Sequence, residues 1–394
     1  MIKLNLKNCT ACGACVQKCP KKCIELKSDV NGFLAPIVNN LECINCGMCN
    51  RVCPIDKTVI AELSSPIAYA CANKNKGVML QETSGGVFGV IADYVLGQGG
   101  VVYGCAYTEH LQASHVRINS KENLFTLFGS KYVQSHTRNT FEECEEDHKN
   151  GRLVLYSGTP CQIAGLKQYL QKNYENLITV DLVCHGVASQ SYFDKFIGFL
   201  EKNVGLNCID YNFRSKKNSG WSIAGIACFK DYKGNTLEKK QYYFSNYYYG
   251  YFLSCSIYRE SCYSCKYANI NRVGDFTLGD FWGVEGLSIP FDVENGCSLV
   301  LLNSVKATKI FDTLDLNKHI VSLDIATKYN RQLVAPSTSR YNRNELLREY
   351  REDDAALIQK KFKKRSRMQN LKGRIKYLLP KKLKRILLKL KYTK

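Results

Sequence analysis

The pattern of hydrophobic and polar residues predicts alternating helices and strands in the middle of the chain. Apolar residues recur at helical spacing over 87–96, and the apolar runs 99–107 and 152–156 are short enough to be strands. A helix is predicted over 162–172 and a second buried strand over 177–183. Strand, helix and strand in this order form a βαβ unit, whose strands lie parallel and are joined by a right-handed crossover. The fold class predicted for the body is therefore α/β, a mixed sheet with a βαβ unit.

A turn of small residues, Ser84, Gly85 and Gly86, precedes the first of these helices, and Gly97 ends it. Ser84 is expected to cap the helix. Exposed N–H groups at such a turn can hold a phosphate, and an ordinary capped core helix explains the same residues equally simply. We favour the core helix at this point.

Two pairs of cysteines mark the far half of the body. Cys161 and Cys184 follow the two strands of the βαβ unit, so both are expected at the carboxyl edge of the sheet, where open α/β folds bind ligands. Cys262 and Cys265 form a Cys-x2-Cys pair further along. Three interpretations stay open for this quartet: a third 4Fe-4S cluster, which we favour, a structural zinc site, or unrelated buried thiols.

The first 60 residues contain an internal repeat of the form Cys-x2-Cys-x2-Cys-x3-Cys-Pro. Zinc sites also use Cys-x2-Cys pairs, but two matched quartets that each end in proline are typical of the bacterial two-cluster ferredoxin module, which is an α+β fold. In that module the fourth cysteine of each run binds the other cluster. We therefore assign to cluster one Cys9, Cys12, Cys15 and Cys53, and to cluster two Cys43, Cys46, Cys49 and Cys19. Cys23 is expected to be a buried thiol outside both sets.

Positive charge is concentrated at the C-terminal end. The 394 residues have 55 Lys and Arg against 35 Asp and Glu, a net charge of +20, and residues 355–394 contain 16 of the basic residues and no acid. Removing that tail leaves 20 − 16 = +4. The tail's apolar residues recur at helical spacing, with Pro380 expected to begin a second helix; they are Leu371, Ile375, Leu378, Leu379, Leu383, Ile386, Leu387 and Leu390.

A basic amphipathic helix of this kind favours docking on an anionic membrane surface. Binding to nucleic acid or to an acidic partner, and a solvated tail without a partner, are the alternatives. Nucleic acid is disfavoured because only the tail charge supports it. The chain begins without an apolar run of signal-peptide length, and its most apolar stretch, 87–107, is broken by Asp93, Gln98 and five glycines. We expect a cytoplasmic protein whose 20 cysteines stay reduced, with some copies on the inner face of the cell membrane.

A set of short motifs between about Ser65 and Lys306 resembles the coenzyme F-420 hydrogenase/dehydrogenase beta-subunit family, a family of iron-sulfur flavoproteins. The motifs are Thr83-Ser84-Gly85-Gly86, Gly129-Ser130-Lys131-Tyr132, Gly158-Thr159-Pro160-Cys161-Gln162, Asp181-Leu182-Val183-Cys184-His185-Gly186, Phe213-Arg214-Ser215-Lys216, Gly220-Trp221, Cys262-x2-Cys265 and Gly279-Asp280-Phe281-Trp282-Gly283. The resemblance implies FAD beside a 4Fe-4S cluster, with the third quartet at the ligand positions. The flavin contacts it implies are Ser84, Gly85, Gly86, Lys131, Gly158 and Thr159.

The resemblance also implies an oxidoreductase. Single electrons from a redox partner such as ferredoxin would pass through the clusters to FAD, which would exchange them with an unknown organic acceptor, in either direction. Relatives with this layout often accompany cell-surface polysaccharide genes; use of deazaflavin does not follow from the residues. The alternative is an electron-transfer adaptor without a substrate of its own. The domains expected are 1–62 (ferredoxin), 63–150 and 151–342 (the two parts of the body) and 343–394 (basic helical tail).

Overall fold

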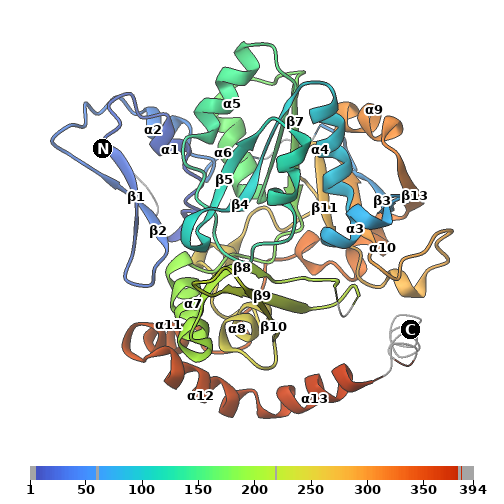
Figure 1. Cartoon of the computed structure of the whole chain (residues 1–394). Helices are drawn as coiled ribbons and strands as arrows, with labels where there is room; N and C mark the ends of the chain where they lie inside the picture. The colour runs from blue at the N-terminus through green and yellow to red at the C-terminus, as the bar shows by residue number, and fades with distance from the viewer. Residues whose placement is uncertain (1–5, 59–61, 218–219, 380–382, 384–394) are drawn as a thin grey trace.

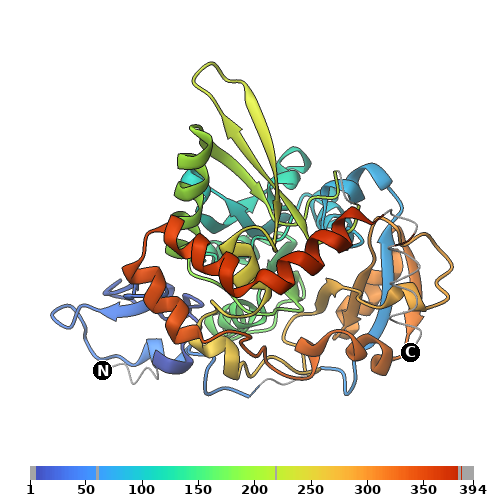
Figure 2. The same ribbon diagram turned by 90° about the horizontal axis from the view of Figure 1, so that it is seen from below.

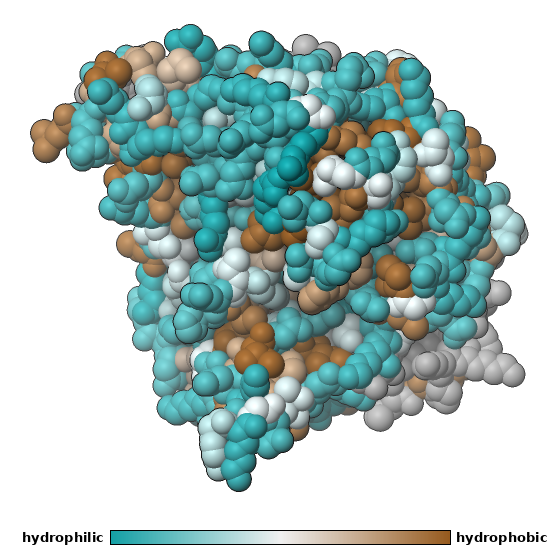
Figure 3. Space-filling model, turned by 45° about the horizontal axis from the view of Figure 1, so that its top comes forward, coloured by the Kyte–Doolittle hydropathy of each residue, from teal (hydrophilic) through white to brown (hydrophobic). Residues whose placement is uncertain are grey.

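The computed structural model describes residues 6–58, 62–217, 220–379 and 383 (Figure 1). An eight-stranded sheet with helices on both faces forms the centre of the body. The N-terminal region lies at one side of this sheet, and a second, smaller sheet lies below it. The surface in Figure 3 is mostly hydrophilic, with apolar residues in separate patches.

The large sheet has the order β13-β3-β12-β11-β7-β6-β4-β5. The bounds along the sheet are β13 Leu316–Val321, β3 Ile67–Asn73, β12 Ser298–Leu302, β11 Phe276–Asp280, β7 Leu177–Leu182, β6 Val154–Gly158, β4 Val101–Tyr107 and β5 Ala113–Ile118. β4, β6, β7 and β11 pair in parallel and the other neighbours antiparallel, so the sheet is mixed. Residues 63–150 and 151–342 both contribute strands, so the two expected parts of the body share one sheet.

The predicted βαβ unit is present and confirms the fold class. β6 and β7 are parallel, with Tyr156 opposite Thr179, and α6 (Pro160–Leu170) connects them. The predicted strand at 152–156 begins two residues later, at Val154. α6 begins earlier than expected because Pro160 suits a first helical position and the Gln162 side chain accepts a hydrogen bond from the Thr159 N–H at 3.0 Å.

Alternate residues of the central strands face two different helical layers. Leu155 and Ile178 pack with α4 (Val87–Gly97) and α9 (Val305–Thr313) on one face. Val154 and Tyr156 pack with α5 (Thr140–Lys149) and α6 on the other. The remaining short helices around this sheet are α3 Lys76–Gln81, α10 Leu323–Lys328, η2 Glu109–Leu111, η3 Lys121–Leu127, η5 Val284–Gly286 and η6 Arg331–Leu333. A largely parallel sheet that is covered by helices on both faces requires strands with apolar residues on both faces.

The smaller sheet encloses an aromatic core. Its order is β10-β9-β8, with bounds Thr236–Tyr242, Ala224–Lys230 and Asn207–Asn212. α7 (Gln190–Val204) and α8 (Tyr247–Leu253) pack against it through buried Tyr and Phe side chains. The aromatic run in α8 is therefore mainly core.

The N-terminal region repeats its backbone as well as its sequence. α1 (Ala14–Gln17) and α2 (Met48–Arg51) follow equivalent loops, and the hairpin β1 (Ile24–Ser28) and β2 (Leu34–Val38) lies between them; η1 is Leu6–Asn8. Gly13 and Gly47, at the start of each helix, have φ of 86° and 72°, a left-handed conformation that glycine adopts without strain. The structure therefore has the small α+β fold expected before the body.

The basic tail begins as part of the body. α11 (Arg343–Glu352), α12 (Ala355–Arg365) and α13 (Arg367–Leu378) follow one another across the underside (Figure 2). Ile358 and Phe362 of α12 are buried in the aromatic core, so this part of the basic tail packs against the body. Pro380 and the apolar positions from Ile386 onward lie outside the described residues. Within the described part of the chain, no helix has the length and apolar character needed to cross a membrane.

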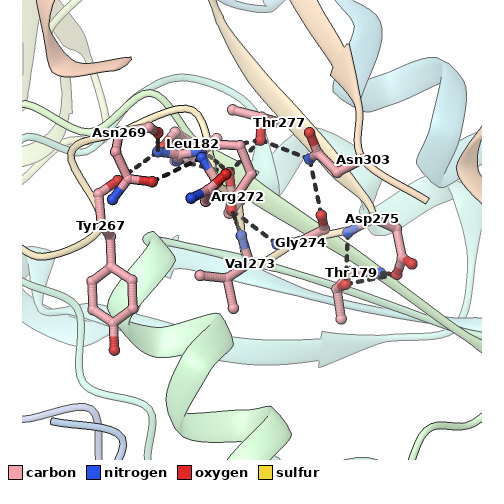
Figure 4. Close-up of polar contacts among 12 residues, drawn as sticks. Thr179, Leu182, Tyr267, Asn269, Arg272, Val273, Gly274, Asp275, Thr277 and Asn303 are labelled. Carbon is pink, nitrogen blue, oxygen red and sulfur yellow. Dashed lines mark hydrogen bonds and ion pairs between the residues drawn. The ribbon is translucent and has the colours of Figure 1, made fainter. Parts of the chain in front are cut away.

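A buried ion pair joins β7 to the loop before β11. Arg272 donates to Asp181 at 2.9 Å, and their side chains are 1% and 0% exposed. Asp181 also accepts hydrogen bonds from the N–H groups of Val273 and Gly274 and from the Thr277 hydroxyl. Figure 4 shows Arg272 among Leu182, Asn269 and Thr277, whose carbonyl or hydroxyl oxygens also accept hydrogen bonds from it. The η4 turn (Glu260–Ser264) precedes Arg272 on the same loop. The Arg272–Asp181 ion pair therefore helps to fix the position of η4 relative to β7.

We predict that Arg272→Ala lowers the free energy of unfolding by about 3–5 kcal/mol, because it leaves the buried Asp181 carboxylate without its partner. Urea denaturation of the full chain measures this change. The matched control is Lys217→Ala, which removes an ion pair to Glu238 with both side chains exposed and should change stability by about 0–1 kcal/mol. Equal effects of the two substitutions would contradict the prediction.

Candidate functional site

A cavity of about 660 Å³ opens at the carboxyl ends of β6, β7 and β11. This is the edge at which open α/β sheets bind ligands. Its other walls come from the 82–84 turn, the 127–135 loop and the 258–268 segment. The volume lies in the range of small-molecule and cofactor sites.

All four cysteines of the third quartet line this cavity. Cys161 is the second residue of α6, Cys184 follows β7, and Cys262 and Cys265 lie on and just after η4. The pKa of Cys161 is raised to about 11 and that of Cys262 to about 12, mainly by burial, and Cys265 contributes to the rise in both cases. Thiols that repel one another in this way need a cation or a metal cluster to be stable as thiolates.

The spacing of these thiols bears on the kind of metal. Zinc bound by four cysteines needs every sulfur about 2.3 Å from one ion. Among the residues that the structure describes, no three histidine, cysteine or carboxylate side chains are close enough to hold a single ion. The kind of metal at this quartet, a 4Fe-4S cluster or a structural zinc ion, stays a prediction.

The N-terminal cysteines form two groups in space. The pKa of Cys15 is raised to about 12, mainly by burial, with contributions from Cys9, then Cys53 and Cys49, so Cys53 of the second run lies near the first. Cys19 in turn lies with the second run around a small cavity of about 30 Å³, which Cys23 also lines. Cys23 is buried, with its sulfur 3.5 Å from that of Cys19. The grouping is the crossed one that the ligand assignment requires.

The first of these groups lies beside α6, near the inner cysteine Cys161. The Cys12 sulfur is so close to Gly165 of α6 that a Cβ there would lie 2.8 Å from it, and Cys161 is among the groups that raise the pKa of Cys12 after burial. Tyr267 is buried near cysteines of both groups: after burial, Cys161, Cys12, Cys265 and Cys53 all contribute to raising its pKa.

Hydrogen bonds from the η4 segment hold the N-terminal region in this position. Arg259 donates to the Cys9 carbonyl at 3.0 Å and also to the Leu34 carbonyl, and Ser261 donates to the Cys9 carbonyl at 3.1 Å. Lys266 donates to the carbonyls of Pro54 and Ile55 at 2.6 and 2.7 Å. The sequence does not predict these contacts, which lie on both sides of Cys262 and Cys265. The sequence feature that could have indicated them is the presence of basic residues, Arg259 and Lys266, beside the Cys-x2-Cys pair.

The residues expected to contact flavin do not all reach the cavity. Ser84, Lys131, Gly158 and Thr159 line it, whereas Gly85 and Gly86 do not. A Cβ at Gly85 would lie 2.3 Å from the Cys71 carbonyl oxygen, so Gly85 allows a close approach to β3. The direct flavin role expected for these two glycines is therefore not supported by their position.

The expectation that Ser84 caps α4 is wrong. Its hydroxyl donates to the Cys297 carbonyl at 2.7 Å, and the N-cap residue is Gly86, with φ of 73°. Glu82 serves the helix instead, because its carboxylate accepts a hydrogen bond from the Gly89 N–H at 2.9 Å. Ser84 thus fixes the turn to the neighbouring strands.

The sequence predicts no role for three charged residues that line the cavity, Arg214, Asp280 and Glu82. Arg214 and Asp280 form a 2.7 Å ion pair on its wall. Glu82 is buried on the same cavity, and burial raises its pKa to about 8. Their burial is what distinguishes them, and a single sequence does not display burial of a charged residue.

Comparisons with known proteins match two parts of the chain. Residues 8–57 match the family model of the 4Fe-4S dicluster domain, and residues 151–328 match that of the C terminus of the coenzyme F420 hydrogenase/dehydrogenase beta subunit. The chain is therefore an iron-sulfur electron-transfer protein of the oxidoreductase class. Residues 151–328 of its body are similar to the C terminus of the coenzyme F420 hydrogenase/dehydrogenase beta subunit, which confirms the resemblance seen in the motifs.

Two further comparisons complete these findings. A chain of the F420-reducing NiFe hydrogenase complex from Methanosarcina barkeri is similar in structure, with a TM-score of 0.45 and 14% identity over 74% of this chain and 95% of that one. A comparison with curated proteins finds no match.

We predict that Glu82 makes the protein less stable as the pH rises from 6 to 8. With its pKa raised to about 8, Glu82 keeps a proton in the folded state that the unfolded state, with an ordinary pKa, has released. Unfolding then releases a proton, and stability falls by at most about 1.4 kcal/mol per pH unit from this group.

Urea denaturation of the full chain at pH 6 and pH 8 tests this prediction. Glu82→Gln, which can still accept the Gly89 N–H, should show a smaller loss of stability over this interval than the unsubstituted protein. Glu352→Gln, at an exposed position of α11, should leave the loss unchanged. The same loss in Glu82→Gln as in the unsubstituted protein would refute the prediction.

Proposed function

We propose that this chain is an iron-sulfur flavoprotein oxidoreductase that relays single electrons through 4Fe-4S clusters to or from FAD and an organic acceptor. The observation that carries the proposal is that four clustered thiols and four of the expected flavin residues line one cavity, with the N-terminal region fastened beside it. FAD, when bound, would exchange two electrons with the acceptor and single electrons with the clusters.

The ligands proposed for the N-terminal clusters are the two crossed quartets, and those for the inner cluster are Cys161, Cys184, Cys262 and Cys265. Arg259 and Lys266 hold the quartet with Cys9 and Cys53 against the cavity, so the quartet around Cys46, which is exposed, is the one that faces outward. A redox partner such as ferredoxin would then approach at the outer quartet.

The cavity offers several groups to a flavin. Thr159 lies at the N-terminus of α6, where helix N–H groups favour a phosphate. The Lys131 ammonium donates to the carbonyls of Thr126 and Phe128 at 3.2 and 2.8 Å, which fixes a cation on the opposite loop. These groups suit the anionic part of FAD.

The alternative function, an adaptor that passes electrons to a separate catalytic protein, needs the thiol groups but not the cavity. We favour the enzyme because the cavity extends beyond the four thiols to buried charged side chains. A role in cell-surface polysaccharide synthesis, in the cytoplasm, belongs to the same proposal; the acceptor itself is unassigned.

Metal and flavin analysis of anaerobically purified protein tests the proposal. We expect about 12 iron and one FAD per chain, falling to about 8 iron in Cys161→Ser/Cys184→Ser because the inner cluster loses two ligands. Cys228→Ser, on β9 and outside every proposed quartet, is the control and should keep the full iron content. About 8 iron, no flavin and one zinc that is lost in the double variant would support the adaptor instead.

We further propose that α13 docks on an anionic membrane surface. Its apolar side chains Met368, Leu371 and Ile375 are 70%, 58% and 53% exposed, next to basic residues of the same helix. Such a face buries apolar area in the interface while its cations attract anionic lipid.

Cosedimentation with vesicles that contain phosphatidylserine measures this binding. Deleting 367–394 should abolish it and leave the iron and flavin content unchanged. Leu371→Ser/Ile375→Ser keeps every cation and should weaken it by about tenfold, since two apolar side chains no longer enter the interface. Undiminished cosedimentation of the deletion variant would refute membrane docking.

A further inference from the structure

The Arg214 guanidinium lies beside the cavity with one of its amino groups unpaired. The side chain is 5% exposed. Its Nε donates to the Ser222 carbonyl at 3.0 Å, and its Nη1 donates to the Tyr132 hydroxyl at 3.1 Å and to the Asp280 carboxylate at 2.7 Å. Nη2 is buried and has no hydrogen-bond partner among the described residues. Buried polar groups almost always have a partner, and a charged group all the more so.

The surrounding side chains hold this guanidinium in one orientation. The second oxygen of Asp280 accepts a hydrogen bond from the indole of Trp221 at 3.0 Å, so both carboxylate oxygens are occupied. Trp221 stacks on Trp282 with 5.5 Å between ring centroids, and the guanidinium carbon of Arg214 lies 5.5 Å from the Trp282 ring. A cation fixed in this way binds a further ligand without losing side-chain freedom.

The charges around the cavity favour an anion at Nη2. Both oxygens of Asp280 are already occupied by Arg214 and Trp221. Burial alone would lower the pKa of Arg214, but Asp280, Tyr132 and Tyr249 together raise it, so the guanidinium stays charged. Lys131 lines the same cavity. The planar fork of arginine matches the oxygens of carboxylates and phosphates, which form its strongest hydrogen bonds.

We propose that Arg214 binds an anionic oxygen, carboxylate or phosphate, of the molecule that occupies the cavity. The oxygen belongs either to the diphosphate of FAD or to the acceptor, and in the second case the acceptor is an organic anion. This inference rests on the proposed function, because FAD and the acceptor are both proposed to bind in this cavity. Asp280 acts through Arg214 as a positioning residue.

Two titrations test the proposal and distinguish the two sources. In the first, FAD and riboflavin are added to flavin-depleted full-chain protein. In the second, inorganic phosphate and acetate are added to protein that retains its flavin, with the flavin absorbance as the signal. Arg214→Lys keeps a cation beside Asp280 but lacks the planar fork. Arg117→Lys is the matched control, because Arg117 pairs with Asp147 at 2.8 Å and does not line the cavity.

If the FAD diphosphate is the ligand, Arg214→Lys should weaken FAD binding by about tenfold or more and leave riboflavin binding unchanged. If the acceptor supplies the anion, flavin binding should be unchanged while the response to phosphate or acetate is lost. The Arg117→Lys protein should match the unsubstituted protein in both titrations. Equal affinities of the Arg214→Lys and unsubstituted proteins for every probe would overturn the inference.

A failure of Arg214→Lys to fold is handled with a second variant. Arg214→Gln/Asp280→Asn removes the charge together with its partner, and the same titrations apply to it. A different result would count against the proposed function itself. If that function is wrong, the unsubstituted protein contains no flavin and shows no affinity for FAD.

Discussion

The candidate site depends on the ion pair between Asp181 and Arg272. Asp181 lies on β7 just before Cys184, and Arg272 follows Cys265 on the loop that leads to β11. Because both side chains are buried and Asp181 accepts additional backbone hydrogen bonds, neither can move without leaving a charge unpaired. The pair therefore sets the distance between Cys184 and the Cys262–Cys265 turn, which no local interaction in the sequence determines.

The same segment performs a second task. Residues 259–267 carry two of the inner cysteines and also the Arg259 and Lys266 side chains that bind backbone carbonyls of the N-terminal region. Two of the inner cysteines and the Cys9 and Cys53 side of the N-terminal region are thus held by one short stretch of chain. A change in the position of this stretch would move Cys262, Cys265 and that side of the N-terminal region together.

Sequence reasoning could predict the parts of the molecule that depend on local pattern. The 34-residue repeat appears in the backbone as well, since Gly13 and Gly47 adopt the same left-handed conformation, and the βαβ unit follows from two apolar strands around one helix. The local pattern favours Ser84 as the cap of α4, but its hydroxyl donates to the Cys297 carbonyl, just before β12 and more than 200 residues away in the sequence. Tertiary contacts of this kind decide between two hydrogen bonds that are equally good locally. The burial of Ile358 and Phe362 escaped prediction because the charge of the tail dominates its composition.

The charged side chains around the cavity bear on whether the chain is an enzyme or an adaptor. An adaptor needs only that its metal groups lie near one another, and burying a guanidinium and a carboxyl group without full pairing would destabilise it for no benefit. Here Arg214 has an unpaired amino group, and Glu82 has one carboxylate oxygen without a partner among the described residues, both on the same cavity. Buried polar groups left unsatisfied next to a cavity are a common feature of sites that bind a polar ligand. The cost in stability is explained if a bound molecule supplies the missing partners, and this favours the enzyme.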